Sequence, residues 1–380
     1  MFAVWWFVDP AKAFPATLAV LVVTCPCALS LATPAVLAAA TAELARRGVL
    51  VAHSDAFEAL ARATHVVWDK TGTLTHGLVR VEEVRPLRDL SPEDCLALAV
   101  ALERCSEHPI ARAFVVPDRS GATARDVHVE PGRGLEGSVD GRRLRIGTLD
   151  YASGLRAPAG VADPGLGAGS WVCLGDAEGL LAAFRLTDPL RAETATVVGR
   201  LATLGLRSSI ASGDAEPAVA ALARRSGIDA FAARLSPQGK VEALKALQAR
   251  GEVVVAVGDG INDAPLLRGA DVSVAMGRGS ALAQTSADLI LVRDSLDQLP
   301  EVVALARRAQ RIVRQNLVWS IGYNLAALPL AALGLVPAWL AALGMSLSSV
   351  LVVLNATRVG RRPRDAAHTP WAGARPARVA

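Results

Sequence analysis

The sequence has few cysteines and few aromatic residues, and neither type is arranged as a framework. Five cysteines, an odd number, are scattered over 380 residues, which argues against a disulfide scaffold and favours a reducing cytoplasm. Aromatic residues make up 4% of the chain and do not alternate with basic ones, so nucleic acid is not indicated as a partner. There is no internal repeat and no signal-peptide pattern.

Charge is missing from two long stretches, and this absence indicates membrane helices. Between Lys12 and Glu43 only the thiols of Cys25 and Cys27 are ionisable, and a second uncharged run extends over 315–357. A membrane helix needs about 20 apolar residues. The first run therefore predicts one span, and the second predicts a helical hairpin that breaks at "GLVP". The hydrophobic share of 52% and the mean hydropathy of +0.35 agree with this.

Arginines flank these runs on the side that the positive-inside rule places in the cytoplasm. Arg46 and Arg47 follow the first run, and two arginine groups bracket the second. The groups are Arg307, Arg308, Arg311 and Arg314 before it, and Arg358, Arg361, Arg362 and Arg364 after it. We predict transmembrane segments at 1–42 (the end of one helix, then the helix of Cys25) and 315–357, followed by a disordered basic tail at 358–380.

The charged middle of the chain predicts a cytoplasmic α/β domain that is interrupted by an insertion. Apolar runs that end in "DKTGT", "SGD" and "GDGIND" alternate with helical patterns, as in a parallel sheet whose strand ends carry the chemistry. We expect this domain at 43–80 and 187–300. The interval 81–186 breaks the rhythm with a glycine-rich "EPGRGLEG" and a short basic strand, and we interpret it as an inserted domain.

Asp69 in "DKTGTLT" is a candidate phosphoryl acceptor, because it stands at a strand end beside Lys70 and a turn rich in backbone amides. In soluble phosphatases with this strand-turn arrangement a second aspartate, two residues later, acts as general acid and base. Thr71 occupies that position here. We therefore expect an aspartyl phosphate that hydrolyses slowly, which suits a cycle coupled to conformational change.

The "GDGINDAPLL" segment offers oxygen ligands for a magnesium ion. Asp259 ends another apolar run and can bind Mg²⁺ beside Asp69 and Thr71. Asn262 and Asp263 are expected to orient these ligands.

Two further segments are suited to a transferred phosphoryl group. Ser212, Gly213 and Asp214 offer a hydroxyl and backbone amides to its oxygens, and Lys240 offers a positive charge. The alternative to a membrane enzyme is a soluble phosphohydrolase with apolar segments by chance.

Together, "DKTGTLT", "SGD", "GDGINDAP" and the membrane "CPC" resemble P-type ATPases of the heavy-metal-transporting subgroup, over the whole chain up to its basic tail. The resemblance implies a multidomain membrane protein with α-helical transmembrane segments. Its cytoplasmic part would be a haloacid-dehalogenase-like, Rossmann-like α/β phosphorylation domain with an inserted α+β nucleotide-binding domain. ATP and Mg²⁺ would be the cofactors, and the location would be the cell membrane.

The resemblance also assigns nucleotide-binding residues in the insertion. His108 and Glu107 of "SEHP" would orient ATP, and Gly132 and Gly134 would let the backbone approach it. Glycines also mark ordinary turns, so the glycine pattern alone is weak evidence. One position departs from the family, because Thr148 stands where asparagine is expected.

The Cys-Pro-Cys sequence predicts a site for a soft transported ion. Pro26 has no N–H, so the carbonyl of Val22 loses its helical partner and the helix opens. Irregular backbone at membrane depth is tolerated where it lines an ion path. The opening lets Cys25 and Cys27 converge, and two thiolates select Cu(I) or another soft ion over Mg²⁺. Small packing residues are the alternative for membrane cysteines.

Residues of the predicted hairpin favour Cu(I) among the soft ions. Tyr323 and Asn324, with Met345 and Ser349 of "MSLSS", match the copper members of the subgroup and would complete the ligand set. Zinc and cadmium members are expected to have a charged residue here, and a thioether suits Cu(I) better than zinc. Ordinary interhelical packing is the alternative. A cytoplasmic copper carrier would then be a partner, and Ser212 in place of threonine resembles the members that serve cytochrome oxidase assembly.

The family's "TGE" loop, whose glutamate positions the hydrolytic water, is absent from the 380 residues. We expect that the actuator domain and the first helices are missing and are supplied in cis or in trans. Three hypotheses follow: the C-terminal part of a Cu(I)-exporting ATPase, a membrane-anchored phosphoryl-transfer enzyme acting alone, and an inactive truncated metal-binding fragment. A zinc or cadmium pump remains the alternative for the metal.

Overall fold

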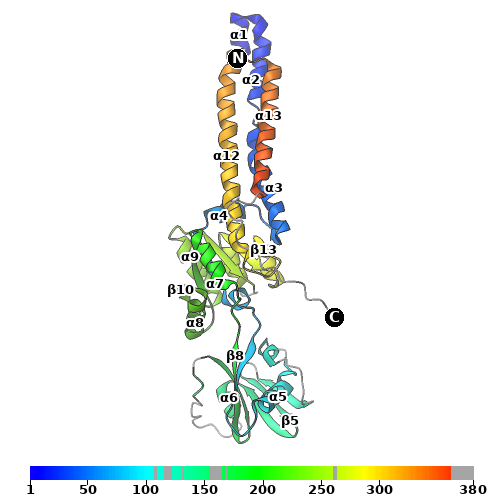
Figure 1. The fold of residues 1–380 in the computed structure, drawn as a ribbon, viewed down its shortest axis with the longest axis vertical. Helices are drawn as coiled ribbons and strands as arrows, with labels where there is room; N and C mark the ends of the chain where they lie inside the picture. Colours follow the sequence, from blue (N-terminus) through cyan, green and yellow to red (C-terminus); the bar gives the residue numbers. More distant parts are fainter. Residues whose placement is uncertain are drawn as a thin grey trace. The chain divides into compact units, whose positions relative to one another are not determined.

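The computed structural model describes residues 1–106, 109–114, 122–130, 132–154, 165–167, 169–259 and 263–360 (Figure 1). The chain divides into two compact units. One comprises Met1–Ala63, Asp288–Arg293 and the chain from Asp297 onward, and the other comprises Thr64–Ala287 with Asp294–Leu296.

The first unit is a bundle of long helices with small residues at their contacts. Its elements are α1 (Phe2–Val8), α2 (Pro10–Val23), α3 (Cys27–Arg46), α4 (Ala56–Arg62), α12 (Gln298–Ala332), α13 (Ala338–Ala356) and the antiparallel pair β1 (Val49–Val51) and β13 (Leu289–Leu291). Ala19, Ala331 and Ala341 are buried in one cluster between α2, α12 and α13. Within the described residues, Pro10–Arg46 and Ala338–Gly360 are long and apolar enough to cross a membrane.

Two features of this bundle bear on the predicted spans. The break at Pro26 lies between α2 and α3, and the Val22 carbonyl accepts a hydrogen bond from the Cys25 N–H at 3.2 Å, so it is not left without a donor. The helix that contains Gln315 begins 17 residues earlier, at Gln298, because arginines on an exposed helix face do not end a helix.

The second unit contains a parallel sheet, as the alternating pattern predicts. Its strands lie in the order β12-β11-β2-β9-β10. Their bounds are β2 His65–Trp68, β9 Arg207–Ala211, β10 Ala230–Ala232, β11 Val254–Gly258 and β12 Val272–Met276. The helices are α7 Thr194–Thr203, α8 Glu216–Ser226, α9 Pro237–Gln248, α10 Ala264–Gly269 and α11 Ala281–Thr285. Every residue of β2, β11 and β12 is buried, which is the rule for strands with both faces covered.

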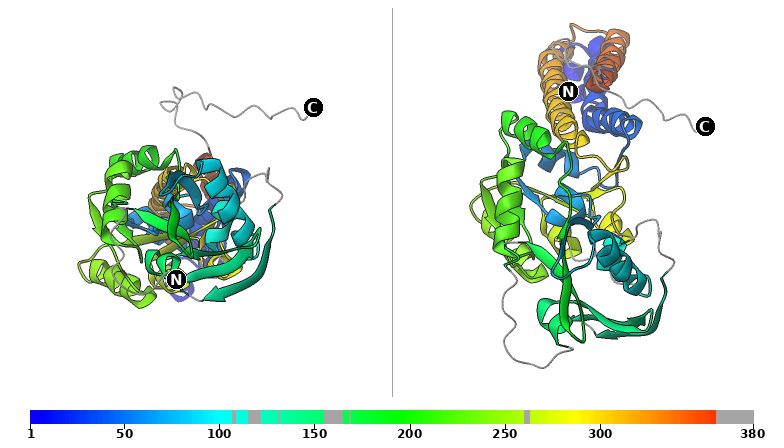
Figure 2. Two further views of the ribbon diagram at one scale, coloured as in Figure 1. Left: turned by 90° about the horizontal axis from the view of Figure 1, so that it is seen from below. Right: turned by 60° about the horizontal axis from the view of Figure 1, so that its bottom comes forward.

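The inserted domain has a six-stranded antiparallel sheet in the order β3-β8-β7-β6-β5-β4. The strands are β3 Arg80–Pro86, β4 Ala124–Glu130, β5 Gly134–Val139, β6 Arg142–Gly147, β7 Ser170–Asp176 and β8 Gly179–Thr187. Helix α5 (Pro92–Glu103) packs on this sheet through a shared apolar core, and α6 (Leu149–Ser153) follows β6 (Figure 2). The mixed α+β insertion in an α/β domain confirms the predicted fold class.

Candidate active site

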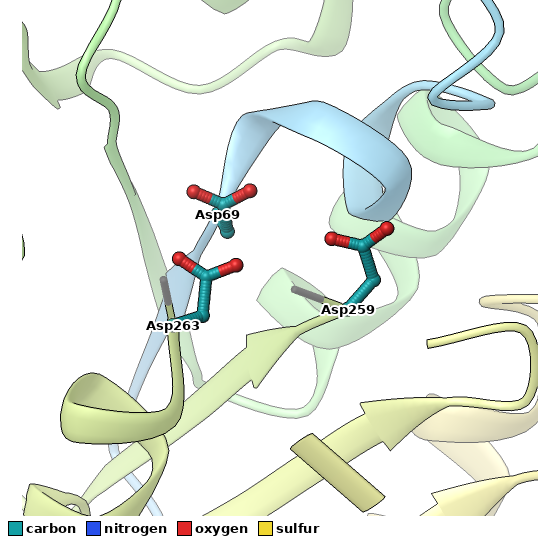
Figure 3. Close-up of side chains that lie close together, drawn as sticks. All are labelled: Asp69, Asp259 and Asp263. Atoms are coloured by element: carbon teal, nitrogen blue, oxygen red, sulfur yellow. The ribbon is translucent and has the colours of Figure 1, made fainter. Parts of the chain in front are cut away.

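Three carboxylates converge where two neighbouring parallel strands end. Asp69 follows β2, Asp259 follows β11, and Asp263 precedes α10. One oxygen from each lies within 4.8 Å of the others, and Figure 3 shows the three side chains gathered at the strand ends. The Asp69 N–H donates to the Val257 carbonyl at 2.9 Å, so sheet pairing fixes the position of the predicted acceptor.

Lysines accompany the carboxylates. The Lys240 ammonium of α9 donates to Asp69 Oδ1 at 2.5 Å and to Asp263 Oδ1 at 2.7 Å. Lys70 forms an ion pair with Asp214. Because Asp69, Asp263 and Lys240 are all buried, this charge cluster is screened little by solvent.

Burial and mutual repulsion make the carboxylates reluctant to ionise. Burial and the nearby Asp263 charge raise the pKa of Asp69 to about 7, although Lys240 opposes the shift. Burial and Asp263 raise the pKa of Asp259 to about 6, against the lowering effect of Arg191. The cluster is therefore short of positive charge, and hard oxygen donors at this spacing fit a magnesium ion.

The loop after Asp69 has a backbone that its sequence requires. Gly72 has φ +73°, and a Cβ at this position would collide with the Asp259 carboxylate. Thr71 is exposed, whereas Thr73 is fully buried with no partner for its hydroxyl among the described atoms. Gly72 thus allows the loop to pass directly over the second metal-ligand candidate.

A clamp of polar residues after β8 fixes this loop, and the sequence analysis missed it. The Arg191 guanidinium donates to the Gly72 carbonyl at 2.9 Å and to the Thr75 carbonyl at 3.1 Å, with Asp294 as its ion-pair partner. The Thr75 hydroxyl donates to Asp188 at 2.5 Å. The only sequence signal was the polar "TDPLR" that follows an apolar strand.

Replacing Arg191 by methionine is expected to destabilise the second unit by about 3–5 kcal/mol, because Asp294 loses the nearer of its ion-pair partners and two loop carbonyls lose a donor. Urea-induced unfolding measures the change. Arg224→Met on the exposed face of α8 removes the same charge and should stay within about 0.5 kcal/mol. Equal effects of the two variants would contradict the clamp.

The predicted phosphoryl-binding turn follows β9. This strand pairs with one edge of β2, and β11 pairs with the opposite edge. Ser212 is buried, its N–H donates to the Ala232 carbonyl, and its hydroxyl accepts from the Asp214 N–H at 3.2 Å. Gly213 lies between them. The three residues therefore occupy the same sheet edge as Asp69, while Asn262 lies outside the described residues.

The nucleotide-binding predictions are only partly covered, because Glu107 and His108 lie outside the described residues. Gly132 has φ +75° with open space around it. Gly134 pairs with Gly147 across β5 and β6, and a Cβ there would collide with the Ile146 carbonyl. Strand packing thus accounts for Gly134 without a nucleotide.

Glu103, at the end of α5, is a candidate site residue that the sequence analysis missed. It is 7% exposed, no hydrogen bond to its carboxylate is found among the described residues, and burial raises its pKa to about 7. It lies three residues before the "SEHP" segment. Its position at the end of the apolar stretch of α5 gave no separate signal.

The predicted ion ligands are distributed over three helical elements. Cys25 and Cys27 flank the break before α3, Tyr323 and Asn324 lie on α12, and Met345 and Ser349 lie on α13. A Cβ on Gly344 of α13 would lie 2.7 Å from the Tyr323 hydroxyl of α12, so α12 and α13 are in close contact at this point.

The cysteines differ from the expectation of two free thiols. Cys25 and Cys27 form a disulfide, because the break at Pro26 places their Cα atoms 5.6 Å apart, within the range for such a bond. Metal binding through thiolates requires the reduced pair.

Comparison with known proteins places these features in a family. Residues 63–271 match the family described as haloacid dehalogenase-like hydrolase. The chain belongs to this family. It is also 40% identical over 366 residues to a copper-exporting P-type ATPase of Mycobacterium tuberculosis, covering 93% of this chain and 48% of the relative. The nitrogen fixation protein FixI of Rhizobium leguminosarum is 40% identical over 95% of this chain and 47% of that protein.

Solved structures agree with the sequence relatives. A zinc-transporting PIB-type ATPase in its E2.Pi state has a TM-score of 0.77 and 35% identity, covering 89% of this chain and 57% of that one. The catalytic domain of the CPx-ATPase CopB-B has a TM-score of 0.57 and 27% identity. The match covers 69% of this chain and 98% of that domain. The predicted resemblance to heavy-metal P-type ATPases and the membrane location are confirmed. The chain spans about half the length of the curated relatives it matches.

Proposed function

We propose that this chain supplies the phosphorylation, nucleotide-binding and ion-pathway segments of an ATP-driven heavy-metal pump. The observation that supports this best is the cluster of Asp69, Asp259 and Asp263 with Lys240 at adjacent strand ends. An Asp69 oxygen attacks the γ-phosphorus of ATP, the bond to the bridging oxygen breaks, and ADP leaves with that electron pair. The product is an aspartyl phosphate.

The residues around Asp69 have separate tasks in this step. Lys240 neutralises charge on Asp69 and on the phosphoryl oxygens. The Ser212–Asp214 turn offers the Ser212 hydroxyl and the Gly213 amide to the phosphoryl oxygens, since the Ser212 and Asp214 amides donate to the Ala232 carbonyl and the Ser212 hydroxyl. Asp69, Asp259 and the Thr71 backbone would hold Mg²⁺, with Asp263 orienting them, and the ion when bound supplies neutralisation of phosphate charge. Arg191 acts indirectly, because it holds the Gly72 and Thr75 carbonyls of the loop after Asp69.

Thr71 makes the aspartyl phosphate long-lived, because no carboxylate stands at the position of the usual acid and base. Hydrolysis then depends on a group from outside these residues. We infer that an actuator segment with a TGE loop supplies it, in cis or in trans.

Cu(I) is the proposed cargo, passed along Cys25, Cys27, Tyr323, Asn324 and Met345, with Ser349 as a further ligand. Thiolates and a thioether favour a soft monovalent ion. The similarity to the solved zinc-transporting ATPase favours zinc as the second candidate. A cytoplasmic copper carrier is the proposed donor.

The test is acyl-phosphate formation from labelled ATP in membranes that contain the reduced chain, with Cu(I), with Zn²⁺ and with a chelator. A hydroxylamine-labile label that Cu(I) stimulates supports the proposal, and stimulation by Zn²⁺ alone moves the cargo to zinc. No label with either metal would refute the catalytic assignment for the lone chain.

Cys25→Ala is expected to abolish stimulation by Cu(I) while leaving ATP binding intact, because one of two thiolate ligands is lost. Cys105→Ala is the matched control, since Cys105 is a free, exposed cysteine outside the helices. Unchanged stimulation in Cys25→Ala would show that the ion path is wrongly assigned.

A further inference from the structure

One face of α12 carries a shallow hollow that the pump proposal does not use. The hollow has a volume of about 480 Å³ and is lined by Arg311, Arg314, Gln315, Val318 and Trp319. All five are exposed, and they lie on one side of the helix at spacings of three, four and seven residues. The positive charges are at one end of the hollow and the apolar groups at the other.

The apolar end is ordered and continues along the helix. The indole N–H of Trp319 donates to the Ser348 hydroxyl of α13 at 3.1 Å, so the ring has a fixed orientation, yet the residue is 49% exposed. Val318 is 72% exposed, and Leu325, two turns further on, is 75% exposed. Together they form an apolar strip above the hollow.

The charged end of the hollow is formed by Arg311 and Arg314. No ion pair to Arg311 or Arg314 is found in the part of the chain that the structure describes. Burial and then the charges of Arg311, Arg358 and Arg47 lower the pKa of nearby Arg308. Arg308 and Arg311 therefore repel each other, and an anion bound beside Arg311 would relieve this repulsion.

The position of the hollow, at the predicted boundary between the membrane and the cytoplasm, indicates which anion binds there. Arg314 is the last charged residue before the uncharged run, and tryptophan prefers the interface between headgroups and acyl chains. An arginine guanidinium matches phosphate oxygens geometrically. We propose that α12 binds an anionic phospholipid, with its phosphate between Arg311 and Arg314 and an acyl chain along Val318, Trp319 and Leu325.

The experiment uses the full chain purified in detergent. It is incubated with equal amounts of dioleoyl phosphatidylglycerol and dioleoyl phosphatidylcholine, and the retained lipids are measured by mass spectrometry after gel filtration. Wild type should retain the anionic lipid preferentially. The double variant Arg311→Gln/Arg314→Gln should reduce that preference roughly 25-fold, at about fivefold per arginine.

The matched control removes two charges elsewhere. Arg224→Gln/Arg225→Gln on exposed α8 positions should keep the wild-type preference. Gel-filtration volume and thermal unfolding establish that both variants are folded. Equal retention of the two lipids by wild type, or an unchanged preference in the α12 variant, would overturn the proposal. Neither readout involves metal or ATP, so the lipid site and the pump can fail separately.

Discussion

The Asp69→Asn variant is expected to form no acyl phosphate from labelled ATP, a loss of at least about a thousandfold, while still binding the nucleotide. The amide has the shape of the carboxylate but is not a nucleophile at phosphorus. It also removes one negative charge from a cluster that has too many, since burial and Asp263 raise the pKa of Asp69 to about 7. The variant should therefore stay folded.

The measurement is hydroxylamine-labile label on the full chain, beside equilibrium binding of an ATP analogue. Asp229→Asn removes a carboxylate from an exposed position between α8 and β10 and should label as wild type does. Labile label on Asp69→Asn would mean that another carboxylate is the acceptor.

Much of this site could be predicted from sequence, because parallel topology determines it. Asp69, Ser212 and Asp259 each follow an apolar run, and parallel strands end at one edge of a sheet, so side chains far apart in sequence meet there. The common direction of the strands predicts a shared edge, and the position of β2 between β9 and β11 brings these three residues together there.

The Arg191 clamp could not be predicted, because it depends on which backbone carbonyls the arginine contacts and not on the residue types involved. Arg191 contacts backbone carbonyls of Gly72 and Thr75, and any residue has a carbonyl. Its counter-ion Asp294 is 103 residues away. Glu103 was missed for a related reason: the burial that raises its pKa is a tertiary property.

The start of α12 shows what a charge pattern does not predict. The uncharged run begins at Gln315, but the helix begins at Gln298, because helix bounds follow backbone hydrogen bonding and caps. Loss of charge predicts where a helix can enter a membrane, not where it begins.

Lys240→Met is expected to destabilise the second unit by about 3–5 kcal/mol near neutral pH, because it leaves Asp69 and Asp263 buried without a cation. Lys240 is 7% exposed and donates to both carboxylates. Burial opposes its charge, but the two aspartates raise the pKa of Lys240 overall. Urea-induced unfolding measures the loss, and Lys245→Met, on the exposed face of the same helix, is the control.

The pH dependence of this loss separates a charge effect from lost packing. The folded pKa of Asp69, about 7, lies above its ordinary value of 3.8, so the group disfavours folding once it ionises: stability is full at low pH and declines as pH rises towards 7. Without Lys240, which lowers the pKa of Asp69, the folded pKa rises further and the decline continues above pH 7, so the loss should be small near about pH 5 and largest near about pH 8. Added Mg²⁺ should restore stability at the higher pH, because the cation replaces the missing ammonium beside Asp69 and Asp259. A loss that is equal at both pH values and insensitive to Mg²⁺ would mean that Lys240 acts by packing alone.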